Sequence, residues 1–169
     1  MGEFDVIVEG MDTLGASSLH SFQVTVQNTN DAPEVGLLLA NQRILEDAQF
    51  VYELPADSFN DIDVGDILSL SASLPSGDAL PDWLSFDTQT RTFSGQPTNS
   101  DVGNIQVRVT ATDLAGLSVD QVFALEVVNT NDSPTVGVTI EAQQATEDIT
   151  FSYALPVGAF TDADITDRL

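Results

Sequence analysis

The sequence contains no cysteine and no lysine, and its four basic residues are all arginine. Without cysteine, disulfides, thiolate zinc sites and cysteine nucleophiles are excluded. Four scattered arginines cannot build the basic face that neutralises phosphates, so nucleic acid is excluded as a partner. No apolar run reaches about 18 residues and none follows a basic N-terminal region, so we expect neither a membrane span nor a signal peptide.

Acidic residues are abundant. The 169 residues include 27 Asp and Glu, which gives a formal net charge of −23. A hydrophobic content of 42% with 18% charged residues still predicts a folded chain rather than a disordered one. Because self-repulsion at this charge opposes the compact state, bound divalent cations are one interpretation of the acidity. The other is an acidic surface that serves only solubility.

The sequence repeats itself at an offset of 101 residues. Residues 28–33 read Asn-Thr-Asn-Asp-Ala-Pro, and residues 129–134 read Asn-Thr-Asn-Asp-Ser-Pro. The same offset aligns residues 4–68 with 105–169 without a gap, and 26 of the 65 pairs are identical. We therefore predict a tandem array. Its parts are the C-terminal hairpin of a preceding repeat at 1–30, a complete repeat at 31–130, and the N-terminal strands of a following repeat at 131–169.

The periodicity within each repeat is that of β-strands. Apolar residues alternate with polar ones in short runs bounded by Pro, Gly, Asn and Asp, at 50–54, 68–74, 83–86, 91–94, 105–111 and 123–127. The last two runs flank a turn at 114–116 and predict a hairpin with one buried face. No window shows a sustained helical stripe. About seven short strands in a hundred residues predict an all-β, immunoglobulin-like antiparallel β-sandwich.

Several motifs give the chain a family resemblance. They are Glu46-Asp47, Phe50-x-Tyr52-x-Leu54-Pro55, Phe59-x-Asp61-x-Asp63, Leu80-Pro81-x-Trp83-Leu84-x-Phe86-Asp87, Phe93-Ser94-Gly95-x-Pro97, Thr110-Ala111-Thr112-Asp113 and Asn131-Asp132-x-Pro134. Together they resemble the dystroglycan-type cadherin-like domain of bacterial surface and secreted proteins, which is also described as an immunoglobulin-like domain. The resemblance implies a cadherin-like sandwich in a large extracellular protein. Arg91 takes a position where the family usually has Gly.

One acidic cluster is expected at the end of the complete repeat that joins residues 28–31. Asp61, Asp63 and Asp66 fall on one loop, and Gly65 permits a sharp turn there. Clustered carboxylates on a turning loop suit Ca²⁺, which takes six to eight oxygen ligands in flexible geometry. In an immunoglobulin-like topology the hairpin tip at Asp113 lies at this same end. We therefore predict a calcium site formed by Asn28, Asn30, Asp31, Asp61, Asp63, Asp66 and Asp113.

The opposite end of the repeat predicts a second calcium site. Its candidate ligands are Glu46, Asp101, Asn129, Asn131, Asp132, Asp162 and Asp164. The resemblance to cadherins implies that calcium at such junctions stiffens a string of domains through a D-x-N-D-N linker. This chain has Asn-x-Asn-Asp-Ala instead, so we expect fewer ions at each junction. If the aspartates only cap turns, they bind no ion.

Other functions have weaker support in the sequence. Trp83 could stack on a sugar, and the resemblance links relatives to polysaccharides, but a large aromatic is also what a sandwich core needs. The single His20 aligns with Gln121, so the sister repeat has no imidazole at that position. No G-x-S-x-G, H-E-x-x-H or phosphate-binding Gly-rich loop is present, and we expect no enzyme activity.

The sequence thus favours a calcium-binding, cadherin-like repeat that acts as a rigid extender or adhesion module at the cell surface or outside a bacterial cell. The alternatives are a polysaccharide-binding module and a calcium-independent acidic spacer. The expected partners are neighbouring repeats of the same chain. Because the flanks at 1–30 and 131–169 lack most of a sandwich, we also expect them to be disordered or to associate between copies by exchanging strands.

Overall fold

The two runs of alternating apolar residues form the longest strands of the central sandwich. In the computed structural model, which describes residues 2–164, these strands are β10 (Gly103–Thr112) and β11 (Ser118–Val128). They pair antiparallel, with Val107 opposite Phe123. Their alternation places every second side chain in the core, and Val107, Val109 and Phe123 are buried. The predicted hairpin is therefore confirmed.

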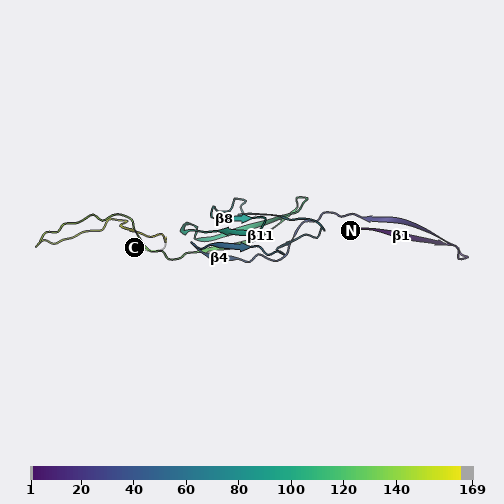
Figure 1. Cartoon of the computed structure of the whole chain (residues 1–169), viewed down its shortest axis with the longest axis horizontal. Coiled ribbons are helices and arrows are strands. Elements are labelled where there is room, and N and C mark those ends of the chain that lie inside the picture. The colour runs from purple at the N-terminus through teal and green to yellow at the C-terminus, as the bar shows by residue number, and fades with distance from the viewer. Residues whose placement is uncertain (1, 165–169) are drawn as a thin grey trace.

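Two sheets pack face to face in the central part of the chain (Figure 1). A four-stranded sheet has the order β4-β11-β10-β7, with β4 (Gln42–Leu45) and β7 (Ser69–Ser73) at its edges. A three-stranded sheet has the order β5-β9-β8, formed by β5 (Phe50–Glu53), β9 (Thr92–Gly95) and β8 (Leu84–Asp87). A short ladder joins β3 (Glu34–Val35) to β6 (Phe59–Asn60), and a 3₁₀ turn, η1 (Asn99–Asp101), precedes β10. The described residues are all-β apart from η1, as predicted.

Aromatic rings fill the space between the two sheets. Phe93 is fully buried between Phe86, at a centroid distance of 4.4 Å, and Phe123, at 5.5 Å. Tyr52 packs edge-on against Phe123 at 5.6 Å. Trp83 is half-buried and contacts the core through Phe50 at 6.5 Å. Offset and edge-on geometries of this kind stabilise aromatic pairs beyond the area they bury.

Two residues in the three-stranded sheet have specific backbone requirements. A Cβ at Gly95 would lie 1.9 Å from the carbonyl oxygen of Trp83, so β9 approaches that carbonyl only because residue 95 has no side chain. Arg91, in the β8–β9 turn, has a φ of 55°. The turn therefore keeps a left-handed residue without glycine, and the guanidinium donates to the carbonyl of Ala56 at 3.2 Å.

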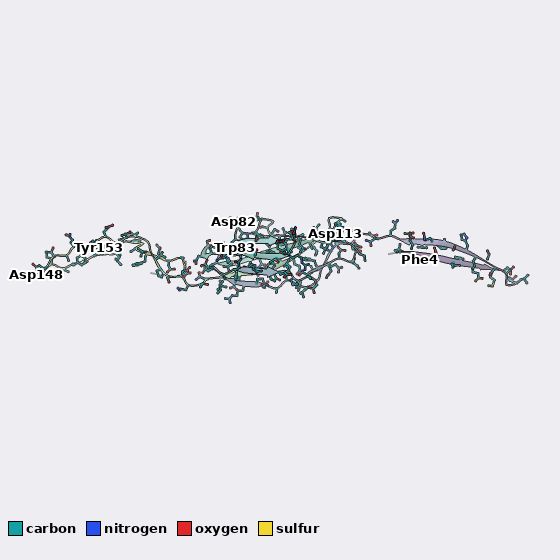
Figure 2. The ribbon with its side chains drawn as sticks, viewed as in Figure 1. Phe4, Asp82, Trp83, Asp113, Asp148 and Tyr153 are labelled. Atoms are coloured by element: carbon teal, nitrogen blue, oxygen red, sulfur yellow. The ribbon has the colours of Figure 1, made fainter. Side chains whose placement is uncertain are left out.

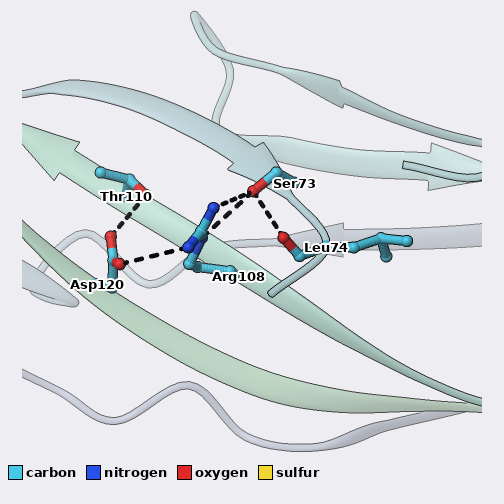
Figure 3. A network of polar contacts seen from close by, with 5 residues as sticks. All are labelled: Ser73, Leu74, Arg108, Thr110 and Asp120. Atoms are coloured by element: carbon cyan, nitrogen blue, oxygen red, sulfur yellow. Dashed lines mark hydrogen bonds and ion pairs between the residues drawn. The ribbon is translucent and has the colours of Figure 1, made fainter. Parts of the chain in front are cut away.

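Polar contacts tie the outer face of the four-stranded sheet together (Figure 3). Arg108 on β10 donates to the hydroxyl of Ser73 on β7 through Nε at 3.3 Å and Nη2 at 3.1 Å. On the other side, its Nη1 lies 4.0 Å from a carboxylate oxygen of Asp120 on β11. Asp120 also accepts from the hydroxyl of Thr110 at 2.6 Å. These contacts link three neighbouring strands on the solvent side.

The flanking segments extend from opposite ends of the sandwich, which makes the chain long and narrow (Figure 1). On the N-terminal side, β1 (Gly2–Met11) and β2 (Ser17–Val26) form an isolated antiparallel hairpin. On the C-terminal side, the chain leaves the sandwich and turns back, and β12 (Thr135–Val136) pairs antiparallel with β13 (Phe160–Thr161). Among the described residues, no helix is long and apolar enough to span a bilayer.

Candidate metal sites at the two ends of the sandwich

The first acidic cluster lies on the loop that follows β6. Carboxylate oxygens of Asp61, Asp63 and Asp66 come within 4.8 Å of one another. The loop turns back on itself because Asp61 Oδ1 accepts the backbone N–H of Asp63 at 2.8 Å and the Asp63 carbonyl accepts that of Asp66 at 3.2 Å. Gly65 has a φ of 101°, the left-handed conformation that the sharp turn requires.

Residues from the linker and from the β10–β11 turn complete this end of the sandwich. The amide of Asn28 donates to Asp63 Oδ1 at 2.7 Å, and the backbone N–H of Asp31 donates to Asp63 Oδ2 at 2.7 Å. The amide of Asn30 donates to Asp113 Oδ2 at 2.9 Å. Figure 2 shows Asp113 at the end of the sandwich that faces the N-terminal hairpin. The structure thus brings together all seven residues proposed for this end.

Two carboxylate oxygens in this cluster lack a partner among the described residues. Asp61 Oδ2 and Asp66 Oδ2 are buried and have no hydrogen bond. Burial raises the pKa of Asp66, and the negative charges of Asp61, Asp113 and Asp63 raise it further. The pKa of Asp113 is lowered, chiefly by the hydrogen bond from the Asn30 amide. The cluster is therefore a set of mutually repelling anions with oxygen atoms left free.

The second cluster lies at the opposite end, between the sandwich and the C-terminal segment. Oxygens of Glu46, Asp132 and Asp164 lie within 4.8 Å of one another. Glu46 and Asp164 are each only 3% exposed. One oxygen of Glu46 accepts the backbone N–H of Thr130, and Asp164 Oδ2 accepts that of Asp132 at 2.7 Å. The remaining oxygens, Glu46 Oε2 and Asp164 Oδ1, are buried and have no hydrogen-bond partner within residues 2–164.

The two ends share a local geometry at the 101-residue offset. The bond from the Asp31 backbone to Asp63 has its counterpart between Asp132 and Asp164, and both measure 2.7 Å. The bond from the Asp63 backbone to Asp61 recurs between Asp164 and Asp162, at 2.8 and 3.0 Å. Asn30 and Asn131 each donate to the carbonyl of the following aspartate, at 2.9 and 2.8 Å. The same sequence therefore folds the same way at both junctions.

Of the seven residues proposed for the second site, Glu46, Asp132 and Asp164 form the cluster, and Asn131 and Asp162 form hydrogen bonds with its members. The other two, Asp101 and Asn129, lie outside it. Asp101 accepts from the backbone N–H and hydroxyl of Thr98, at 2.9 and 2.8 Å, and caps η1. Asn129 is exposed, and no hydrogen bond among the described residues joins its side chain to the cluster. Asn99 was not predicted, yet its amide donates to Asp132 Oδ2. The sequence feature that could have indicated Asn99 as a site residue is its position two residues before Asp101, on the same turn.

The chemistry of both clusters fits a hard divalent cation. Each offers several oxygen ligands and no nitrogen or sulfur ligand, which is the donor set of Ca²⁺ and Mg²⁺. Buried carboxylate oxygens without donors are costly, because burial removes their hydration and nothing replaces it. The described ion pairs, Arg43–Glu126 and Arg108–Asp120, do not involve these clusters. A bound cation would supply the missing positive charge.

Known structures with a similar fold are extracellular cadherin domains. Domains 1–4 of protocadherin gamma B7 match with a TM-score of 0.59 and 21% identity over 88% of this chain and 37% of that one. Domains 1–5 of protocadherin gamma B2 match with a TM-score of 0.58 and 14% identity over 95% and 38%. Domains 1–3 of mouse protocadherin PcdhgC3 match with a TM-score of 0.51 and 20% identity over 75% and 43%.

The chain spans less than half of each of these cadherin structures, and the identities are low enough that they show the fold alone. No curated protein matches the sequence. The sequence model of the family described as "Putative Ig domain" matches residues 32–128, which is more than half of the chain and covers the sandwich from β3 to β11. The chain therefore belongs to this family of immunoglobulin-like domains.

Proposed function

We propose that this chain is a calcium-binding, cadherin-like repeat that acts as a rigid, non-enzymatic extender or adhesion module of a large extracellular or cell-surface protein. The observation that carries the proposal is the set of four buried carboxylate oxygens without a hydrogen-bond partner, two at each end of the sandwich. The family resemblance to dystroglycan-type cadherin-like domains supports the same assignment. Its motifs include Glu46, Asp61 and Asp63, which contribute to the clusters.

Calcium would act on the junctions through charge and through geometry. The linker residues Asn30 and Asp31 contact Asp113 and Asp63 of the sandwich, so an ion held by these loops also fixes the linker. Neutralising the carboxylates removes their mutual repulsion, and restraining the linker sets the angle between neighbouring repeats. Extracellular calcium modules have dissociation constants of about 10⁻⁴ to 10⁻³ M, which suits a protein outside the cell.

The test is thermal unfolding of the whole chain in EDTA and in increasing calcium, with magnesium as the control ion. At 10 mM calcium and a dissociation constant of about 10⁻⁴ M, each ion stabilises the folded state by about 2.7 kcal/mol. A shift of roughly 10 °C or more in Tm is therefore expected. No shift, or an equal shift with magnesium, would leave the acidic spacer as the better description.

Variants locate the ions. Asp61→Asn with Asp63→Asn removes charge from the first cluster, and Glu46→Gln removes it from the second. We expect each to lower the number of calcium ions bound in isothermal titration calorimetry. Asp82→Asn is the matched control, because Asp82 is exposed and lies outside both clusters. If all three variants bind calcium alike, the clusters are not the sites.

Polysaccharide binding through Trp83 is the alternative function. The indole is half-buried and packs edge-on against Phe50 at a centroid distance of 6.5 Å, so it packs against the core. This position gives the residue a structural role in the sandwich, and the calcium proposal has the stronger geometric support. A saturable change in tryptophan fluorescence with polysaccharide, at constant calcium, would favour the alternative.

A further inference from the structure

The two sheets of the sandwich leave a small cavity between them. Its volume is about 80 Å³, and it lies between β7 of the four-stranded sheet and the β8–β9 turn of the three-stranded sheet. The lining residues are Leu54, Pro55, Ser58, Phe59, Leu68, Leu70, Thr88 and Arg91. All of them lie inside the range 32–128 that matches the family model, and none belongs to either acidic cluster. The cavity is therefore a feature of the sandwich itself.

The inner wall of this cavity is apolar. Leu54 and Phe59 are 1% and 8% exposed, and Leu70 on β7 packs against the same core. The Ser58 hydroxyl donates to the carbonyl of Pro55 at 2.8 Å, so this polar group already has a partner. An apolar cavity of about 150 Å³ accepts benzene. A cavity of about 80 Å³ therefore suits an alkyl group of roughly three or four carbon atoms.

Arg91 adds a positive charge to the cavity wall. Its guanidinium donates through Nη1 to the carbonyl of Ala56 at 3.2 Å, and neither ion pair among the described residues involves it. Asp87 lies on the same turn, but its Oδ1 accepts the backbone N–H groups of Gln89 and Thr90, at 2.8 and 3.0 Å. The guanidinium therefore keeps donors for a ligand. Its planar fork of N–H groups matches the two oxygens of a carboxylate.

The backbone at Arg91 is a second observation about this residue. Its φ of 55° lies in the left-handed region, which glycine adopts without steric cost and other residues adopt rarely. Non-glycine residues in such conformations cluster at ligand-binding sites, where the side chain compensates for the strain. Arginine at this turn position is therefore better explained by what its side chain does in the cavity wall than by the needs of the turn.

We infer that this cavity binds a small aliphatic carboxylate, with the alkyl group beside Leu54, Phe59 and Leu70 and the carboxylate on the Arg91 guanidinium. The net charge of −23 repels anions from the molecule as a whole, so a carboxylate needs this local cation. A free short-chain carboxylate and the C-terminal valine of a peptide both offer this chemistry. One charged contact and a small apolar area give an expected dissociation constant on the order of 1 mM.

Two-dimensional ¹H–¹⁵N NMR of the whole chain tests the site, with butyrate as the probe, in EDTA and at constant ionic strength. The amide signals of Leu54, Phe59 and Arg91 should shift saturably with butyrate. Butyramide has the same alkyl chain without the charge, and acetate has the charge without the chain, so each should bind about tenfold more weakly or worse. Equal binding of butyramide, or no saturable shift up to about 50 mM butyrate, would overturn the proposal.

The two sources of the carboxylate are separated by a second pair of probes. N-acetylvaline represents the C-terminus of a peptide, and 3-methylbutanoate has the same branched carbon skeleton without the amide. Tighter binding of N-acetylvaline supports a peptide terminus as the ligand, whereas equal or tighter binding of 3-methylbutanoate supports a free carboxylate. If neither shifts the signals of the lining residues, the cavity does not accept a branched aliphatic carboxylate and the proposal fails.

Substitutions of arginine separate the role of the cation from that of the fold. Arg91→Gly removes the guanidinium and suits the left-handed backbone, so it should stay folded in thermal unfolding and bind butyrate at least about tenfold more weakly. Arg91→Gln is a second variant that removes the charge and should weaken binding similarly. The control is Arg43→Gln, because Arg43 pairs with Glu126 and does not line the cavity. Equal butyrate binding by the parent chain and both Arg91 variants, or an equal loss in the control, would contradict the site. None of these tests requires calcium, so they stay valid if the calcium proposal fails.

Discussion

At the scale of single residues, the acidic side chains of Asp113 and Asp66 have opposite effects on stability. Asp113 has a lowered pKa because the Asn30 amide stabilises its charge, so ionised Asp113 stabilises the fold. Asp66 has a raised pKa because it is desolvated and close to other carboxylates. The stability that Asp66 contributes is present below its unfolded pKa and is lost as the pH rises through its folded pKa. At neutral pH and without a cation, ionised Asp66 therefore destabilises the fold.

We expect Asp66→Asn to melt at a higher temperature than the parent chain at pH 7 in EDTA, because the substitution removes a repelling charge. In saturating calcium the order should reverse, since the variant has lost a ligand. Differential scanning calorimetry at pH 7 and pH 4 checks both parts. The difference in EDTA should shrink as the pH is lowered, because protonation removes the Asp66 charge. An unchanged order of melting in calcium would show that Asp66 is not a ligand.

At the scale of secondary-structure elements, one buried side chain joins β11 to the segment between β3 and β6. Gln121 is 6% exposed and makes three hydrogen bonds to the backbone of the segment between β3 and β6. The shortest, to the Ser58 carbonyl, is 2.7 Å. The bond to Leu39 gives a buried backbone N–H a partner, whereas the Ser58 carbonyl also accepts the backbone N–H of Gly36 at 3.0 Å.

Gln121→Ala should lower the free energy of unfolding by about 1 to 3 kcal/mol, because it removes the partner of the buried backbone N–H of Leu39. Urea denaturation in calcium measures the effect. Gln106→Ala is the control, since Gln106 is an exposed glutamine on β10 and its loss should change stability by less than about 0.5 kcal/mol. Equal effects of the two substitutions would show that the three bonds contribute no net stability.

Strands with strong alternation could be predicted from the sequence, and elements held by distant contacts could not. The alternating run from Ile105 to Ala111 predicted β10, because one face of this strand is buried along the run. The two-residue strands β3 and β6 have too little sequence to show a period. The acidic loop at 61–66 was visible as a candidate site, whereas Asn99 contributes through a contact to Asp132 that depends on the packing of η1. Asp101 was predicted as a metal ligand, but its carboxylate accepts the backbone N–H of Thr98 within the same turn.

At the scale of the whole molecule, the negative charge opposes the compact state. The net charge is −23, and the second cluster places carboxylates on both sides of its junction, with Glu46 on the sandwich and Asp164 on the C-terminal segment. Without cations the junctions should open, because repulsion acts between the linker and the loops that it contacts. With calcium, the same residues should hold the flanks in line with the sandwich.

Small-angle X-ray scattering of the chain, extrapolated to low concentration, tests this expectation. Calcium should narrow the distribution of interatomic distances toward that of a straight, narrow particle, and EDTA should broaden it. Added sodium chloride in EDTA should reproduce only part of the change, because screening weakens repulsion without linking the residues. Identical profiles in calcium and EDTA would show that the ions do not order the junctions.

The parallel pairing of β4 with β11 has a consequence for how the protein resists tension. The chain enters the sandwich beside the N-terminal hairpin and leaves it at the other end, and β4 and β11 both run toward the exit (Figure 1). A pull along the long axis draws β4 back toward the entrance and β11 toward the exit. The ladder from Gln42–Leu125 to Leu45–Val128 is thus loaded in shear, so its hydrogen bonds must break together rather than one after another.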